Sequence, residues 1–479
     1  MKKILLMIVV FTGIFSCTDD ITGLNQNTKD ATVVPATYVF TNAQKNIVDQ
    51  MVSTNVNNNV FRLFTQQWTE TTYTDESNYD VTTRTVPDNH WGVIYRDVLK
   101  DLQESRKLLM QYVPATTQEE KENANRIAIV DILSAYSYSV LVDTFGDVPY
   151  SEALDVEAHP LPKYDDAQTI YKDLISKLTA ASTTLDSGYD SFGDADLIYA
   201  GSAAKWKLFA NSLRLKMAIN MDDIDHTYAS AQALAAVADG VITSNSNNTA
   251  LKYLSAQPNA NPIFVDVVAS GRNDFVPTST VIDQMNGLND PRRSAYFDIN
   301  GSNYVGGTPG DGNTFANFSH IGTTLLDPTF EGLIMDATEV EFTLAEAVER
   351  GIAVGGTAES HYNAAITASM SYWGVSAGDI STYLSQLSVA YTTATGTWKQ
   401  KIGEQAYLGL YNRGFESWTS YRRLDFPVLT APVDAAVNQV PTRYTYPARE
   451  ETLNSANNAA ASSAIGGNTL TTKLFWDVH

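Results

Sequence analysis

The chain has 479 residues, of which 44% are hydrophobic, and its 32 basic and 54 acidic side chains give a formal net charge of −22. This charge repels phosphate backbones, so it argues against nucleic acid as a partner and, more weakly, against strongly anionic substrates. A chain of this size can bury a large apolar core, and its single cysteine excludes an internal disulfide.

The amino terminus has the pattern of an export signal. Met1 to Lys3 is basic, residues 4–15 form a nearly unbroken apolar run, and Ser16 precedes Cys17. The run is too short to cross a bilayer as a helix but suits a signal peptide. We therefore predict a lipoprotein signal peptide over residues 1–16 and lipid attachment to Cys17. The alternative is an ordinary signal peptide or an anchor helix that contains a cysteine by chance.

Apolar residues at three- and four-residue spacing predict two helix pairs in the first half of the chain. The predicted helices cover residues 91–113, 117–145, 167–185 and 203–220. A capping box of Thr117 and Glu120 is expected to begin the second helix, and Gly146 to end it. Asp165 or Asp166 is expected to cap the third helix and Ser202 the fourth.

Two further pairs are predicted in the second half, with residues 338–351 paired to 357–374, and 376–392 paired to 397–424. Four antiparallel helix pairs suggest an all-α fold of degenerate tetratricopeptide-like units stacked into a superhelix. Trp206, Phe209 and Trp418 are expected in the core, and Arg214 with Arg422 or Arg423 to pair with acids.

Irregular sequence interrupts the helical pattern in three places, at residues 66–89, 240–336 and 427–450. The middle segment is rich in Gly, Asn, Pro and Ser, and a structureless loop of that length would be implausible in a compact domain. We expect one domain over residues 17–479, with a helical scaffold at about 89–239 and 337–424 and an irregular ligand-binding lobe at about 240–336. Irregular segments on a rigid frame usually carry binding residues.

Motifs for catalysis or for a resident cofactor are not found: the sequence has no HExxH, GxSxG or P-loop pattern. A tethered hydrolase that uses an unrecognised pair of carboxylates remains an alternative. One acidic segment could hold calcium or form a solvated turn, and its carboxylates are Asp186, Asp190, Asp194 and Asp196. No metal site and no cofactor are predicted.

Abundant Tyr and Asn side chains favour an uncharged polar ligand such as a sugar, although most aromatic residues pack between helices. The candidates that fall in irregular sequence are Trp68, Tyr73, Asn78, Tyr79, Arg272, Asp274, Phe275 and Tyr304. The first four lie in the segment 66–89, and the others in the central lobe.

Several segments resemble the SusD/RagB family of Bacteroidetes outer-membrane lipoproteins, and they occur in the family's order. After the "TDD" that follows Cys17, they are "FTQQWTETTYTDESNYD", "DTFGDVPYSEAL", "GSAAKWKLFANSLRLKMA", "NDPRRSAYFD", "LAEAVERG", "YNRGFESWTSYRRLDFPVL", "VPTRYTYPAREETLN" and "KLFWD". The resemblance covers essentially the whole chain from Cys17 onward.

The resemblance implies a tetratricopeptide-like superhelix with an irregular binding half, and no catalytic activity. It also implies a surface-exposed outer-membrane lipoprotein, held in the membrane by its lipid, that captures glycans for a SusC-type TonB-dependent transporter. Family members place part of their glycan-binding platform in the segment that corresponds to residues 66–89. A RagB-like, peptide-binding role is the alternative within the family.

Overall fold

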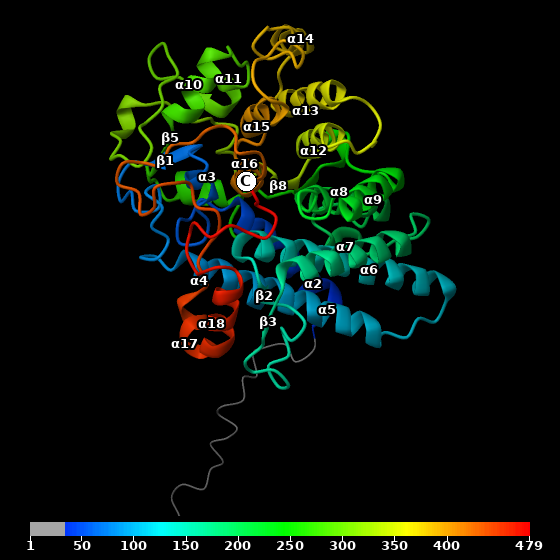
Figure 1. Ribbon diagram of the computed structural model, residues 1–479. Helices are drawn as coiled ribbons and strands as arrows, with labels where there is room; N and C mark the ends of the chain where they lie inside the picture. Colours follow the sequence, from blue (N-terminus) through cyan, green and yellow to red (C-terminus); the bar gives the residue numbers. More distant parts are fainter. Residues whose placement is uncertain (1–33) are drawn as a thin grey trace, which may run out of the picture. The chain divides into compact units, whose positions relative to one another are not determined.

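The computed structural model of this protein describes residues 34–479, which form a largely helical chain (Figure 1). The predicted signal peptide and the lipid-bearing Cys17 lie outside the described residues. The amino-terminal helices are α2 (Ala36–Val52), α3 (Phe61–Phe64), α4 (Val86–Gly92), a π-helical segment (Val93–Leu99), α5 (Lys100–Gln111) and α6 (Thr117–Phe145). The predicted helix over 91–113 is therefore present, but it begins earlier and contains a π-helical stretch.

Local sequence sets the ends of α6. The hydroxyl of Thr116 accepts a hydrogen bond from the backbone N–H of Glu119, so the cap lies one residue before the predicted Thr117 and Glu120. The Glu119 carboxylate turns back to accept from the N–H of Ala115 at 2.8 Å. Gly146 ends the helix as predicted, and its φ of 86° is a conformation that glycine adopts without strain.

Helix α6 is long and apolar enough, by composition, to cross a membrane. However, 83% of its apolar window is buried inside the protein, which is typical of a core helix. It packs between α5 and the next helix along the chain, α7 (Ala167–Thr184), and this packing accounts for its composition.

Three more helices continue the stack, and each begins at an aspartate or serine cap. They are α7 (Ala167–Thr184), α8 (Ala203–Asn220) and α9 (His226–Asp239), capped by Asp166, Ser202 and Asp225. The apolar periodicity of the sequence does not predict α9, because the buried face of this helix consists of alanines, which give a weak apolar signal. Neighbouring helices pack in chain order from α5 to α9 (Figure 1).

The second half of the scaffold contacts the first half where α12 packs on α8. Its helices are α12 (Ala337–Glu349), α13 (Ala358–Tyr372), α14 (Ala377–Leu384), α15 (Trp398–Gly409) and α16 (Gly414–Leu424). Helix α12 packs on α8, α13 and α15, and α15 packs on α16. The predicted all-α fold is confirmed.

The fourth predicted pair is wrong in detail. Helix α14 ends at Leu384 rather than at 392. Leu387 is exposed although it lies four residues after buried Tyr383, so the buried face of the helix does not continue. The predicted helix over 397–424 is broken into α15 and α16. Gly414 begins α16 where it meets α3, and a Cβ there would lie 2.6 Å from the backbone nitrogen of Arg62.

Short antiparallel strand pairs connect the irregular segments. The strands are β1 (Trp68–Glu70), β2 (Val148–Pro149), β3 (Tyr164–Asp165), β4 (Thr249–Leu251), β5 (Phe275–Pro277), β6 (Phe297–Asp298), β7 (His320–Ile321) and β8 (Gly332–Met335). They pair as β1–β5, β2–β3, β4–β8 and β6–β7. The remaining α-helices are α10 (Ser279–Gly287), α11 (Arg293–Tyr296), α17 (Ala448–Leu453) and α18 (Ser455–Ala464), and a second π-helical segment covers Phe264–Ala269.

The predicted core tryptophans are buried. The indole N–H of Trp206 donates to Asp196 at 2.6 Å, and that of Trp418 donates to the carbonyl of Pro441 at 2.6 Å. The guanidinium of Arg422 lies 3.5 Å from the Trp418 ring and donates to backbone carbonyls, whereas Arg423 pairs with Glu346 at 2.9 Å. Of these two arginines, only Arg423 forms the predicted pair with an acid.

Candidate functional site

Two irregular segments that are far apart in sequence meet at the β1–β5 ladder. In this ladder Trp68 lies opposite Pro277, and Glu70 lies opposite Phe275. The backbone N–H of Thr71 continues the pairing by donating to the carbonyl of Asp274 at 2.8 Å. The segment 66–89 and the central lobe are therefore fixed to one another at this point.

A pocket of about 380 Å³ lies beside this ladder. Four of the predicted ligand-binding residues line it, namely Tyr73, Arg272, Asp274 and Phe275. The Tyr73 side chain is 72% exposed, so its ring is accessible to a ligand. Phe275 is mostly buried in β5 and contributes only an edge of the wall.

Other lining residues were not predicted. The neutral ones include Thr54, Asn55, Asn57 and Thr72, and the charged ones are Glu70, Arg84 and Asp266. Glu70, Thr72 and Arg84 fall inside the segment 66–89, so its irregular sequence was a usable signal. The lining residues near position 55 do not lie in a long irregular segment, because they directly follow helix α2. The sequence therefore gives no comparable indication that they line a pocket.

The charged groups of the pocket largely neutralise one another. Arg272 Nε lies 2.5 Å from the Asp274 carboxylate, and Arg84 Nε lies 2.5 Å from the buried carboxylate of Glu76. The carboxylate of Asp266 accepts from the backbone N–H and the hydroxyl of Thr54 at 3.3 and 3.1 Å. The pocket therefore offers many donors and acceptors without a strong field of one sign.

Glu70 adds a buried acid whose pKa is raised above its ordinary value. Burial, followed by the charge of neighbouring Glu76, raises the pKa of Glu70 to about 8. Both the backbone N–H and the hydroxyl of Ser77 donate to its carboxyl group, at 2.9 and 3.0 Å. A protonated carboxyl can donate a hydrogen bond as well as accept one.

Two of the residues predicted to bind the ligand have their rings buried in the core of the protein. Trp68 is 1% exposed, and its indole N–H donates to the hydroxyl of Tyr411 at 2.8 Å. Tyr79 is fully buried, with its hydroxyl accepting from Gln66 at 3.0 Å. Neither ring has a face that a sugar could reach.

The remaining two candidates do not line the pocket. The side-chain amide of Asn78 donates to the carbonyls of Thr74 and Gly310 at 2.9 and 2.8 Å, which fixes the loop in place. Tyr304 is half-buried in the central lobe, with the guanidinium of Arg293 lying 5.5 Å from its ring. The structure thus gathers Tyr73 with Arg272, Asp274 and Phe275, and separates them from Asn78 and Tyr304.

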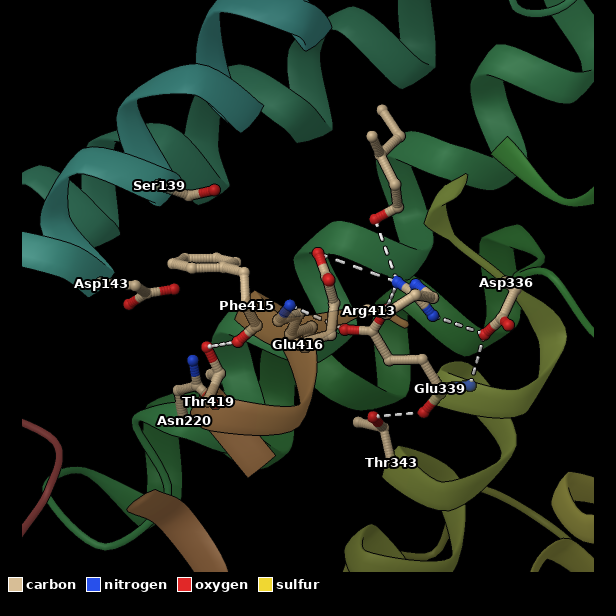
Figure 2. A network of polar contacts seen from close by, with 12 residues as sticks. Ser139, Asp143, Asn220, Asp336, Glu339, Thr343, Arg413, Phe415, Glu416 and Thr419 are labelled. Carbon is tan, nitrogen blue, oxygen red and sulfur yellow. Dashed lines mark hydrogen bonds and ion pairs between the residues drawn. The ribbon is translucent and has the colours of Figure 1, made fainter. Parts of the chain in front are cut away.

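The interior also contains a network of buried ions where α8, α12 and α16 meet (Figure 2). Arg413 lies 2.7 Å from Asp336 and 2.5 Å from Glu339, and Lys216 approaches Glu339 at 2.7 Å. Burial raises the pKa of Glu416 to about 6, against the lowering effect of Arg413. Because these charges satisfy one another away from solvent, we assign the network to the scaffold.

The acidic segment near position 190 is not arranged as a calcium site. Within residues 34–479, no group of three His, Cys, Asp or Glu side chains is placed to hold a metal ion. Asp196 instead accepts from Gln44 and from Trp206, at 2.7 and 2.6 Å. Asp186 accepts from the backbone N–H of Gly188 at 3.0 Å, as in a solvated turn.

Comparison with known proteins supports a single family. The SusD-like family, described as starch-binding and associating with the outer membrane, matches residues 27–447. A solved chitin-binding protein is 27% identical, with a TM-score of 0.79, and the alignment covers 93% of this chain and 100% of that one. No curated protein matches the chain.

Two further solved structures have the same fold. A SusD homologue from Bacteroides uniformis is 25% identical, with a TM-score of 0.79, over 92% of this chain and 100% of its own. A chitin-binding SusD homologue from Flavobacterium johnsoniae is 23% identical, with a TM-score of 0.77, over 92% and 99%. This chain belongs to the SusD-like family of starch-binding proteins that associate with the outer membrane.

Proposed function

We propose that this protein is a surface-exposed, non-catalytic lipoprotein that captures oligo- or polysaccharides and delivers them to a SusC-type TonB-dependent transporter. The observation that carries the proposal is the accessible ring of Tyr73 in a pocket lined by neutral amides, hydroxyls and mutually paired charges. A sugar presents C–H faces that stack on an aromatic ring, while its hydroxyls need neutral hydrogen-bonding partners. The family description and the chitin-binding relatives support a glycan rather than a peptide.

The pocket favours weak binding to each sugar unit. An aromatic contact contributes on the order of 1 kcal/mol beyond the burial of its area, so affinity depends on several contacts acting together. We expect a dissociation constant in the micromolar range or weaker. Because the Arg272–Asp274 and Arg84–Glu76 pairs neutralise their own charges, binding should change little with salt.

Membrane attachment is proposed through the lipid on Cys17 alone. Two or more acyl chains anchor a protein firmly, whereas one chain gives only marginal binding. The family's association with the outer membrane supports this arrangement. Delivery to a transporter implies a complex with it, which pull-down of the lipidated protein from solubilised outer membranes would test.

The experiment is a calorimetric titration with soluble starch and with chitin oligosaccharides, using the wild type and Tyr73→Ala. We expect saturable binding that is weakened severalfold in the variant, with an unchanged melting temperature, because Tyr73 is exposed. Tyr38→Ala, at an exposed tyrosine of α2, is the matched control and should bind as the wild type does. Equal affinity of Tyr73→Ala and the wild type would contradict the proposal that this pocket binds the glycan.

The same samples distinguish binding from catalysis. After prolonged incubation the polysaccharide should show no new reducing ends. Released reducing ends that disappear in Glu70→Gln or in Asp266→Asn would establish a hydrolase instead. Binding of short peptides with no affinity for any glycan would establish the RagB-like alternative.

A further inference from the structure

A second pocket, of about 650 Å³, lies in a different part of the molecule. The strand end after β4, the loop before β8 and the carboxyl end of α13 form its walls. Its main lining residues are Tyr253, Thr324, Thr329, Phe330, Tyr372 and Trp373. None of the residues that line this pocket also lines the pocket at Tyr73.

The wall of this second pocket is aromatic. The rings of Phe330 and Trp373 are stacked, with centroids 5.8 Å apart and planes at 26°. Tyr372 meets Trp373 edge-on at 5.5 Å. All three side chains are half-buried, unlike the fully enclosed rings of Trp206 and Trp418. The core therefore leaves part of this aromatic surface available to solvent.

The surrounding structure holds the wall in place. The side-chain amide of buried Asn261 donates to the carbonyl of Phe330 at 2.7 Å, and its backbone N–H donates to the carbonyl of Pro328 at 2.8 Å. Asp327 accepts from the backbone N–H and the hydroxyl of Thr329, at 2.7 and 2.6 Å. A binding surface that is already ordered loses little entropy when a ligand arrives.

The scaffold also fixes the indole ring of Trp373. Tyr296 packs against it at 4.7 Å in an edge-on arrangement, and the Tyr296 hydroxyl donates to the carbonyl of Leu408 at 3.0 Å. Tyr253, at the other edge of the pocket, donates from its hydroxyl to Asp49 at 2.8 Å. The aromatic residues thus come from rigid elements rather than from a loop alone.

The polar groups around the aromatic wall suit an uncharged ligand. The exposed side chains of Thr324 and Thr329 supply hydroxyls, and the only charged lining residues are Lys252 and Glu331, which carry opposite charges. The volume of about 650 Å³ falls within the usual range for ligand sites and could enclose a short stretch of sugar rings. An aromatic wall with neutral hydroxyls at its rim is the surface on which sugar rings stack.

We propose that the pocket at Phe330 and Trp373 is a second, independent binding site for neutral oligosaccharides. It shares with the proposed function only the chemical class of the ligand, and it does not depend on the pocket at Tyr73. Two sites on one chain would let the protein hold a long polysaccharide more firmly than either site alone, provided that the polymer spans both.

The test uses chitin and starch oligosaccharides, and equilibrium dialysis over a range of ligand concentrations gives the number bound per chain and the dissociation constant of each. We compare the wild type with Tyr73→Ala, Trp373→Ala and the double variant. Two molecules should bind to the wild type, each single variant should weaken the binding of one of them severalfold, and the double variant should weaken both. Because Trp373 also packs against Tyr296, Thr324→Arg is a second variant that fills the pocket while leaving every aromatic side chain in place.

The outcomes separate this proposal from the proposed function. Loss of one bound oligosaccharide in Thr324→Arg, with an unchanged melting temperature, supports the second site. If one molecule binds to the wild type, Tyr73→Ala weakens its binding severalfold and Thr324→Arg has no effect, then the second site is overturned while the first stands. If Thr324→Arg abolishes all binding and Tyr73→Ala has no effect, the pocket at Tyr73 is overturned while the second site stands. Absence of binding to the wild type would overturn both.

Discussion

The indole N–H of Trp68 donates a hydrogen bond of 2.8 Å to the hydroxyl of Tyr411, and the Tyr411 ring in turn stacks on Tyr296 at 4.2 Å. Trp68 belongs to β1, Tyr411 to the connection between α15 and α16, and Tyr296 to α11 in the central lobe. These three rings join the segment 66–89, the helical scaffold and the central lobe in one buried contact. The position of the pocket at Tyr73 therefore depends on packing behind it.

Trp68→Ala should lower the free energy of unfolding by about 3–5 kcal/mol, because it removes a fully buried indole and leaves a cavity. Trp68→Phe should restore most of the packing and lose about 1 kcal/mol for the missing hydrogen bond. Urea unfolding followed by circular dichroism measures both. Unchanged stability in the alanine variant would contradict the burial of this side chain.

Glu70 should make the stability of the protein depend on pH. Burial and the charge of Glu76 raise the pKa of Glu70 to about 8, above the ordinary value of 4.5. The folded protein therefore retains a proton that the unfolded chain releases, so the contribution of Glu70 to stability is fully present below pH 4.5 and is lost as the pH rises toward 8. Glu70→Gln, which cannot titrate, should gain in melting temperature over the wild type as the pH rises.

The comparison is made by thermal unfolding at pH 5, 7 and 8.5. Glu359→Gln, at an exposed glutamate of α13, is the matched control. Its melting temperature should stay close to that of the wild type at all three pH values. A constant difference between Glu70→Gln and the wild type across this range would show that Glu70 is ionised in the folded protein at neutral pH.

Arg413→Met should lower the free energy of unfolding by about 3–5 kcal/mol, because it leaves the buried carboxylate of Asp336 without a cation and leaves Glu339 with Lys216 alone. The loss should be larger at pH 8 than at pH 5. Removing the cation raises the pKa of the remaining acids, so their protonation at low pH relieves part of the cost. Chemical unfolding at the two pH values measures the difference.

A double variant gives the control for this network. Adding Asp336→Asn to Arg413→Met should recover part of the lost stability, since it removes the carboxylate that had become unpaired. Additive losses in the double variant would contradict the coupling that the 2.7 Å contact between Arg413 and Asp336 implies.

Cys17→Ala should abolish lipidation and release the protein from the membrane fraction into the soluble fraction. The prediction follows from the apolar run and the small residue before Cys17. Fractionation and labelling with a radioactive fatty acid measure the result. A Cys17→Ala protein that stays in the membrane of cells lacking the transporter would contradict attachment through this residue.

Local sequence alone determined much of the helical scaffold. The caps at Asp166 and Ser202 and the termination at Gly146 depend on hydrogen bonds and backbone angles within a few residues, so they could be predicted. The burial of Trp206 and Trp418 followed from helical periodicity, because a helix presents one face to its neighbours. The ordered series of motifs was sufficient to indicate the family.

Only the tertiary structure decided which aromatic residues of the segment 66–89 face solvent. Trp68, Tyr73 and Tyr79 lie in similar polar, non-periodic sequence, yet Tyr73 is 72% exposed while Trp68 and Tyr79 are buried. Without a repeating helix or strand, spacing along the chain does not specify which side chains share a face. Their environments were set instead by contacts with the distant β5 and with the connection between α15 and α16.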